Sequence, residues 1–214
     1  MDANTNLLNS ILYELQNVRY GYHVGRSRNL HEENGYNLTF EYWLICTIAR
    51  PKELLSHGTG CCLDQSAYII SRLHDHCIPW NYIQLYVTIT TTYSSDGKCF
   101  LAAHFVPIVY CSGCWWVLEH CNPGRNGAFP FKSYRDAVNY IRKCLQEVGI
   151  GTVDGFYMEC TNASAADLKW FTQGGMTYLK AAERFLKNSS PEAPKWFSDM
   201  DAGLKKAKPP LPAM

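Results

Sequence analysis

The stretch Gly58-Thr59-Gly60-Cys61-Cys62-Leu63-Asp64-Gln65 is typical of a tight turn that runs into a helix. Glycines at positions 58 and 60 allow the chain to turn sharply and allow another molecule to approach the backbone closely. A cysteine in the first turn of a helix lies near unpaired N–H groups and the positive end of the helix dipole, which lower its pKa. The same N–H groups can stabilise an oxyanion. Because buried structural cysteines also begin helices, this stretch indicates a nucleophile only if the chain supplies a base.

Three segments after this helix have the patterns of strands. Residues 82–90 alternate strictly between apolar and polar side chains, which is typical of a half-buried strand. Two further apolar segments, 100–110 and 114–121, follow after short links of polar and glycine residues. The simplest prediction is a meander of three consecutive strands.

The turn between the second and third strands predicts their register. If Ser112-Gly113 forms a two-residue turn flanked by Cys111 and Cys114, His104 and Glu119 lie on the same face of the sheet as diagonal neighbours. Such neighbours are about 7–8 Å apart at the backbone, within reach of long side chains. A carboxylate that accepts a hydrogen bond from one imidazole nitrogen fixes the tautomer and leaves the other nitrogen for a thiol.

Two alternatives to this pair stay open in the sequence. His120 falls on the opposite face in the predicted register, but a slip of one residue would exchange Glu119 for His120. His104 also fits a structural histidine inside a sheet. A carboxylate in the apolar segment 115–119 is costly to bury without a partner, and this favours its pairing with His104.

Residues around these positions resemble the transglutaminase-like proteins, relatives of the papain-type cysteine hydrolases. Gly60-Cys61-Cys62-Leu63-Asp64 is similar to the family motif of glycine, any residue, cysteine, any residue, aspartate. A bacterial subset of this family has a histidine strand, a turn and then an acid strand. These resemble His104, the turn that follows it and Trp115-Trp116-Val117-Leu118-Glu119-His120, although many family members carry Asp as the acid. The resemblance covers about residues 40–145. It implies that Cys62 is the nucleophile, His104 the base and Glu119 the orienting acid, and that Asp64 is structural.

The resemblance also implies an α+β fold. An antiparallel sheet is expected to pack against the helix that carries the nucleophilic cysteine, with extra helices at the N- and C-terminal ends. We expect a catalytic domain over residues 1–150, a C-terminal helical extension over 151–204 and a flexible proline-rich tail over 205–214.

Local patterns predict the remaining elements. Apolar residues at helical spacing predict a first helix over 5–18 and an amphipathic helix over 134–148, with Ser133 as its N-cap. A further helical stretch over 162–188 is broken by Gly174-Gly175. The polar segment 20–37 and the segment between residue 124 and Ser133 are predicted to be loops.

The activity implied by the resemblance is cysteine-dependent acyl transfer on an amide through a thioester. The reaction is peptide or amide hydrolysis, glutamine deamidation or transglutamination, depending on the acceptor. The expected partner is a protein or peptide substrate with Gln or another amide. A non-catalytic peptide- or protein-binding module that retains the fold is the alternative.

No cofactor and no metal are expected. Possible zinc ligands are the two cysteines of Cys111-Ser112-Gly113-Cys114, with Cys99, Cys121 and His120 nearby. A second ligand pair at recognisable spacing is missing. The same residues make a good hairpin turn.

The composition is that of a globular chain of 214 residues with 47% hydrophobic residues and a formal net charge of +1. This charge gives no electrostatic reason to expect binding to nucleic acid or to an anionic membrane. Residues 1–4 lack a basic or apolar leader pattern, so we expect a cytoplasmic protein with reduced thiols despite its ten cysteines. The sequence does not predict an oligomeric state.

Overall fold

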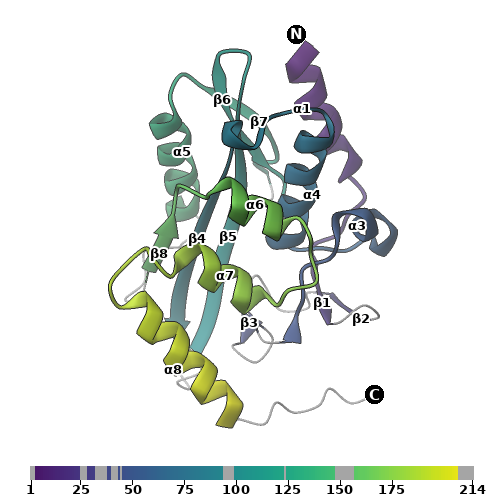
Figure 1. The fold of residues 1–214 in the computed structure, drawn as a ribbon. Helices are drawn as coiled ribbons and strands as arrows, with labels where there is room; N and C mark the ends of the chain where they lie inside the picture. The colour runs from purple at the N-terminus through teal and green to yellow at the C-terminus, as the bar shows by residue number, and fades with distance from the viewer. Residues whose placement is uncertain are drawn as a thin grey trace.

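The computed structural model describes most of the chain. The described residues are 3–24, 28–31, 38–39, 43, 45–93, 99–122, 124–147 and 157–206. They form a mixed α+β structure in which helices surround a central antiparallel sheet (Figure 1). This confirms the α+β class predicted from the sequence.

The central sheet has the strand order β7-β6-β5-β4-β8, and β3 also pairs with β5. Its strands are β3 (Leu38–Thr39), β4 (Ile83–Tyr93), β5 (Cys99–Cys111), β6 (Cys114–Glu119), β7 (Gly127–Phe131) and β8 (Tyr157–Cys160). All of these pairings are antiparallel, and β4, β5 and β6 are the meander that the sequence predicts.

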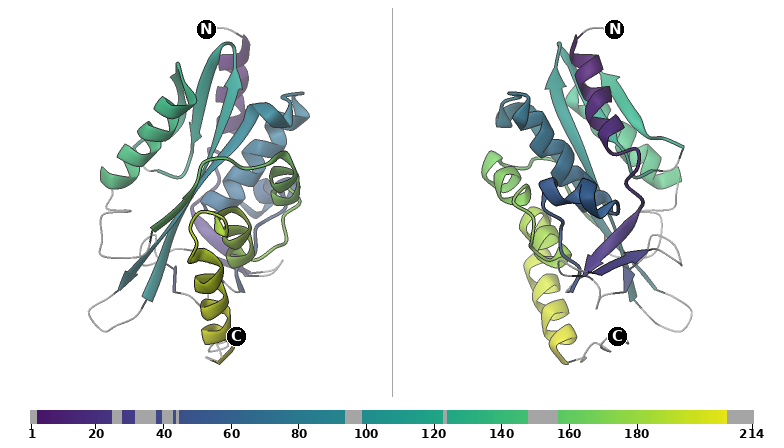
Figure 2. Two further views of the ribbon diagram at one scale, coloured as in Figure 1. Left: turned by 60° about the vertical axis from the view of Figure 1, so that its left-hand side comes forward. Right: turned by 90° about the vertical axis from the view of Figure 1, so that its right-hand side faces the viewer.

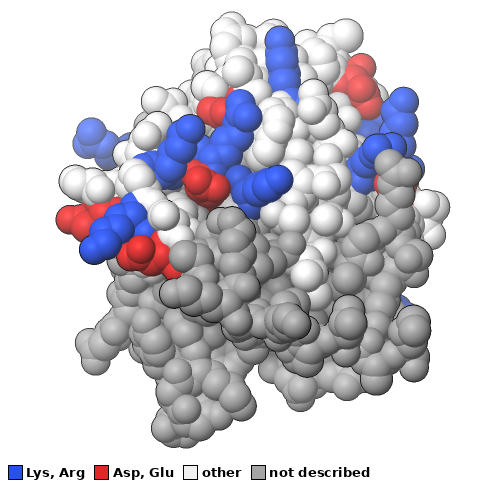
Figure 3. All heavy atoms as spheres, turned by 60° about the horizontal axis from the view of Figure 1, so that its bottom comes forward, with Lys and Arg blue, Asp and Glu red and all other residues white. Residues whose placement is uncertain are grey.

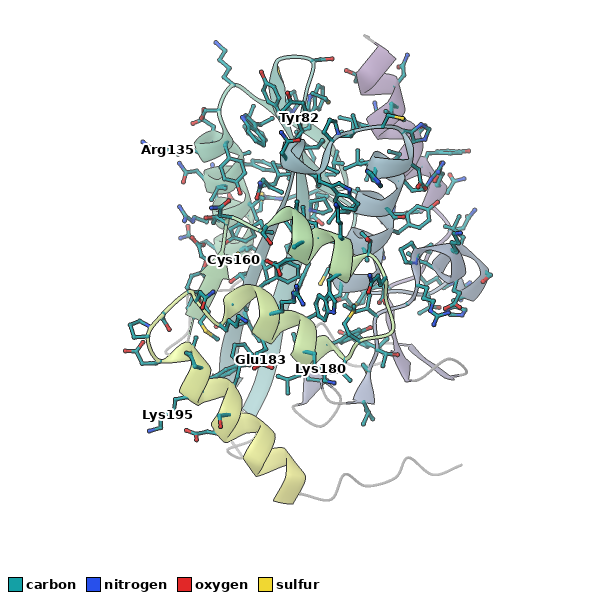
Figure 4. The ribbon with its side chains drawn as sticks, viewed as in Figure 1. Tyr82, Arg135, Cys160, Lys180, Glu183 and Lys195 are labelled. Atoms are coloured by element: carbon teal, nitrogen blue, oxygen red, sulfur yellow. The ribbon has the colours of Figure 1, made fainter. Side chains whose placement is uncertain are left out.

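Helices cover both faces of the sheet. Helix α5 (Tyr134–Glu147) lies on one face; α4 (Cys62–Asp75), α6 (Ala165–Phe171) and α7 (Tyr178–Leu186) lie on the other (Figure 2). Two separate hydrophobic clusters follow from this arrangement, a small one under α5 and a larger one under the remaining helices. Lys180 and Glu183 lie on the outer surface of α7 (Figure 4), whereas its buried residues complete the larger cluster. The other helices are α1 (Ala3–Glu14), α3 (Pro51–His57), the short 3-10 turn η1 (Trp80–Tyr82) and α8 (Ala193–Lys206).

The start of α4 lies against the backbone of β5, and this contact positions the candidate site. The ladder between β5 and β6 covers the hairpin end, from Ile108 to Cys111 on β5. Beside the segment of β5 that precedes this ladder, Ser66 of α4 donates a hydrogen bond from its hydroxyl to the carbonyl oxygen of Phe105 at 2.8 Å. Helix α4 therefore reaches the sheet next to His104.

Several predicted boundaries need correction. The expected loop over 20–37 contains a hairpin of β1 (Gly21–Val24) and β2 (Arg28–His31), and the loop expected before Ser133 contains β7. The region predicted as a helical extension also supplies β8, which pairs with β4. The first helix ends at Glu14 rather than residue 18. Of the predicted tail, residues 205 and 206 belong to α8, and residues 207–214 lie outside the described part.

Within the described part of the chain, no helix is both long and apolar enough to cross a bilayer. On the face drawn in Figure 3, Lys and Arg side chains lie among Asp and Glu side chains. This mixture of charges agrees with the formal net charge of +1.

Candidate active site

Cys62 is the first residue of α4, and a buried carboxylate fixes the backbone around it. The carboxylate of Asp64 accepts hydrogen bonds from the backbone N–H of Cys61 at 2.8 Å and of Ala49 at 2.6 Å. The hydroxyl of Tyr178, on α7, donates to the same carboxylate at 3.0 Å. Asp64 is fully buried. These bonds explain the aspartate of the sequence motif, because its position two residues after Cys62 lets it hold the turn before the helix.

The two glycines of the turn act differently. Gly58 has a φ of 65° and caps α3, and its N–H donates to the carbonyl oxygen of Leu54 at 3.1 Å. Gly60 has no unusual φ, but a Cβ there would lie 2.5 Å from Cδ1 of Leu54 and 2.9 Å from Cβ of Asp64. The first glycine therefore allows the left-handed turn, and the second allows close packing of α3 against α4.

The predicted register of β5 and β6 is confirmed. Cys111 pairs with Cys114, and Ser112 and Gly113 between them have φ values of 51° and 76°. Positive φ at both central residues is the mark of the two-residue hairpin turn. In this register the imidazole Nε2 of His104 and the carboxylate Oε2 of Glu119 are 2.7 Å apart.

Both members of this pair are almost fully buried, with 8% of His104 and 7% of Glu119 exposed. The second oxygen of Glu119 accepts a hydrogen bond from the backbone N–H of Cys121 at 2.9 Å. Each carboxylate oxygen is therefore bound, which fixes the orientation of the carboxylate and, through it, of the ring. Because Nε2 faces Glu119, Nδ1 is the ring nitrogen left for the thiol.

The structure brings the predicted nucleophile to this pair. Cys62 is buried, with 2% of the residue exposed. Its sulfur lies 3.6 Å from the carbonyl oxygen of Ala103, the residue before His104. Together with a hydrogen bond from Cys61, the nearby His104 side chain lowers the pKa of the Cys62 thiol by hydrogen bonding and by its charge. The three residues singled out from the sequence, Cys62, His104 and Glu119, therefore meet at the start of α4.

Electrostatics favour a thiolate at Cys62. A hydrogen bond from Cys61 is the largest influence on the pKa of Cys62, and with the hydrogen bond and charge of His104 it outweighs burial and lowers that pKa to about 6. Burial lowers the pKa of His104, but the charge of Glu119 and the bonds to both partners raise it to about 10. Between these two values the thiolate and imidazolium forms coexist as an ion pair. Burial raises the pKa of Cys61 instead, so the two adjacent thiols differ sharply in character.

Tyr20 is a neighbour of the thiol that the sequence did not reveal. The N–H of Arg19 donates to the carbonyl oxygen of Gly58, and the N–H of Gly60 donates back to the carbonyl oxygen of Arg19, both at 2.9 Å. These bonds hold Tyr20 beside the turn that leads to Cys62. Burial raises the pKa of Tyr20, and the charge of the Cys62 thiolate is the next largest cause.

His120 also lies near the site, although it is not a member of the triad. The alternation of β6 places Leu118 in the cluster against α4 and Val117 in the cluster under α5, and His120 follows on the α4 side, opposite Glu119 as the sequence predicts. There Nδ1 of His120 lies 2.5 Å from the side-chain oxygen of Gln65 on α4. The register slip considered from the sequence is not needed to bring His120 to the helix.

Among the described residues, no group of three or more His, Cys, Asp or Glu side chains has the arrangement of a metal site. Cys111 and Cys114 face each other across the hairpin, and the carbonyl oxygen of Cys111 accepts a hydrogen bond from the Trp116 indole at 3.2 Å. The side chain of Cys99 lies outside the described part.

No protein-family model and no curated protein matches the chain.

Proposed function

We propose that the protein is a cysteine-dependent acyl-transfer enzyme that acts on amides through a Cys–His–Glu triad. One observation carries the proposal: a cysteine at the first residue of a helix has its sulfur 3.6 Å from the backbone oxygen of Ala103, beside the His104 imidazole that a buried carboxylate holds at 2.7 Å. Nucleophile, base and orienting acid are the three parts that thiol catalysis needs. The motif resemblance and the sheet packed beside the cysteine-bearing helix support a transglutaminase-like, papain-related fold.

In the first step, the Cys62 thiolate attacks the carbonyl carbon of the substrate amide. The negative charge moves to the carbonyl oxygen, where the N–H of Cys62 at the helix start can donate a hydrogen bond. We assign the second donor to the hydroxyl of Tyr20, because the backbone bonds of Arg19 hold this residue beside the turn, and burial and then the charge of the Cys62 thiolate raise the pKa of its hydroxyl. When the intermediate collapses, the C–N bond breaks and the imidazolium of His104 gives its Nδ1 proton to the leaving amine.

The second step releases the acyl group from the sulfur. Neutral His104 takes a proton from the acceptor, which attacks the thioester carbonyl, and the C–S bond breaks to restore the thiolate. Water as the acceptor gives hydrolysis or, at a glutamine side chain, deamidation; an amine gives a cross-link. We favour hydrolysis of a peptide or amide substrate, with no metal taking part.

The proposal is tested by labelling with iodoacetamide at pH 6, followed by peptide mass spectrometry. The exposed Cys77, just beyond the C-terminal end of α4, is an internal reference in the same sample. We expect selective alkylation of Cys62, and we expect His104→Ala to abolish this selectivity because the thiolate loses its cationic partner. Slow labelling of Cys62 at or below the rate of Cys77 would instead support a non-catalytic binding module.

A further inference from the structure

A chain of two hydrogen bonds joins the acid strand to the turn before the nucleophile. The side-chain nitrogen of Gln65 donates to the carbonyl oxygen of Gly60 at 2.8 Å. The side-chain oxygen of Gln65 lies 2.5 Å from Nδ1 of His120. Only 2% of Gln65 is exposed, so this amide has no ready access to water as a substitute partner.

Chemistry fixes the direction of both bonds. A backbone carbonyl can only accept, so the amide nitrogen of Gln65 must face Gly60. The amide oxygen that remains can only accept, and Nδ1 of His120 must therefore carry a proton. Burial lowers the pKa of His120, which favours the neutral ring, and the bond to Gln65 assigns the one N–H of that form to Nδ1.

These two hydrogen bonds link the strand that carries Glu119 to the turn that carries Cys62. His120 follows Glu119, the residue that holds His104, and Gly60 lies two residues before Cys62. The bond between Glu119 and His104 orients the base on the sheet, but it does not involve the helix. The bonds through Gln65 connect the end of β6 to the turn that sets the sulfur.

We propose that His120 is a positioning residue that sets the distance between the Cys62 thiol and the His104 ring. It acts by donating from Nδ1 to Gln65, which in turn holds the carbonyl of Gly60. The inference rests on the proposed function of the triad, and it assigns His120 no contact with the substrate. Its role depends on a donor at Nδ1 and not on a lone pair at Nε2.

Two amide substitutions separate these requirements. The amide nitrogen of Asn occupies about the place of Nδ1, so His120→Asn keeps a donor for Gln65. The amide of Gln lies about where Nε2 does, so His120→Gln is the matched comparison of similar polarity. His120→Ala removes both. Misplacement of a reacting group by 1 Å can cost about 10²-fold, so we expect His120→Ala and His120→Gln to slow alkylation of Cys62 at pH 6 by about 10–100-fold.

The expected result is that His120→Asn alkylates Cys62 within about threefold of the wild type, since the donor is retained. In a Gln65→Leu background, His120→Ala should slow the alkylation of Cys62 little further, because both substitutions break the same pair of hydrogen bonds. Equal rates for His120→Asn and His120→Gln, or full additivity with Gln65→Leu, would overturn the positioning role while the triad stands. A wild type without selective labelling of Cys62 would overturn both proposals.

Discussion

Replacing Glu119 by Gln removes one charge from the site and nearly preserves its shape. The amide oxygen of Gln can still accept from Nε2 of His104, and the side chain has the same length. What disappears is the negative charge, which lies 2.7 Å from the ring on a side chain that is almost fully buried, and one acceptor, because the Gln nitrogen cannot accept from the N–H of Cys121. The imidazolium form of His104 therefore loses its main electrostatic support, and the pKa of the ring must fall.

The size of the expected fall in the pKa of His104 follows from its distance to the lost charge. An opposite charge within 4–6 Å shifts a pKa by about 1–3 units. Each unit corresponds to about 1.4 kcal/mol, so the lost stabilisation of the imidazolium is about 1.4–4 kcal/mol. In the wild type the pKa of His104 is raised to about 10, and Glu119→Gln should move its titration down by about 1–3 units.

The titration is measured by NMR of histidine labelled with ¹⁵N, in which the chemical shifts of ring nitrogens report protonation. The chain has seven histidines, and the His104→Ala variant assigns the signal. Glu14→Gln is the matched control, because Glu14 is also a hydrogen-bonded carboxylate, held by Arg72 at 2.9 Å, but lies on α1. An unchanged titration of His104 in Glu119→Gln would refute the idea that this carboxylate holds the ring in its charged form.

Three further substitutions test separate parts of the site. Tyr178→Phe removes the donor to buried Asp64 and should lower the free energy of unfolding, measured with urea, by about 1.5–3 kcal/mol; no loss would mean that this bond does not support the turn. Cys61→Ala removes the hydrogen bond that most lowers the pKa of Cys62, so alkylation of Cys62 should slow at pH 6 but not at pH 9, and a loss at both pH values would contradict this cause. Tyr20→Phe should slow acylation by p-nitrophenyl acetate by about 10²–10³-fold and leave iodoacetamide alkylation unchanged, since only acylation forms an oxyanion; equal effects on both would exclude the donor role.

The sequence was sufficient for the pair of His104 and Glu119 because local chemistry sets it. Ser112-Gly113 can form a two-residue turn, and this turn fixes the register from which the diagonal contact follows. The structural role of Asp64 came from the motif resemblance, and its bond to the N–H of Cys61, which spans three residues, agrees with it. The α+β class was likewise implied by the resemblance, and strand alternation and helical spacing agreed with it.

Contacts between distant segments were not predictable from local patterns. Tyr178 reaches Asp64 across 114 residues, and Tyr20 comes to the site through backbone bonds of Arg19 that no side-chain pattern encodes. Alternation in β6 correctly placed His120 on the face opposite Glu119, but its contact with Gln65 was not predictable because it joins residues 55 positions apart. Strands β7 and β8 are short, and β7 contains a proline, so neither has a clear period.

A difference titration of Cys62 examines the ion pair itself. A thiolate absorbs in the far ultraviolet where a thiol does not, and subtracting the spectrum of Cys62→Ser removes the signals of the other cysteines. We expect the difference absorbance of the wild type to rise with a midpoint near pH 6, and the His104→Ala protein to lose this transition. A midpoint at the ordinary pKa of cysteine, about 8.5, would contradict an activated thiol, and a midpoint near pH 6 that persists without His104 would contradict the ion pair.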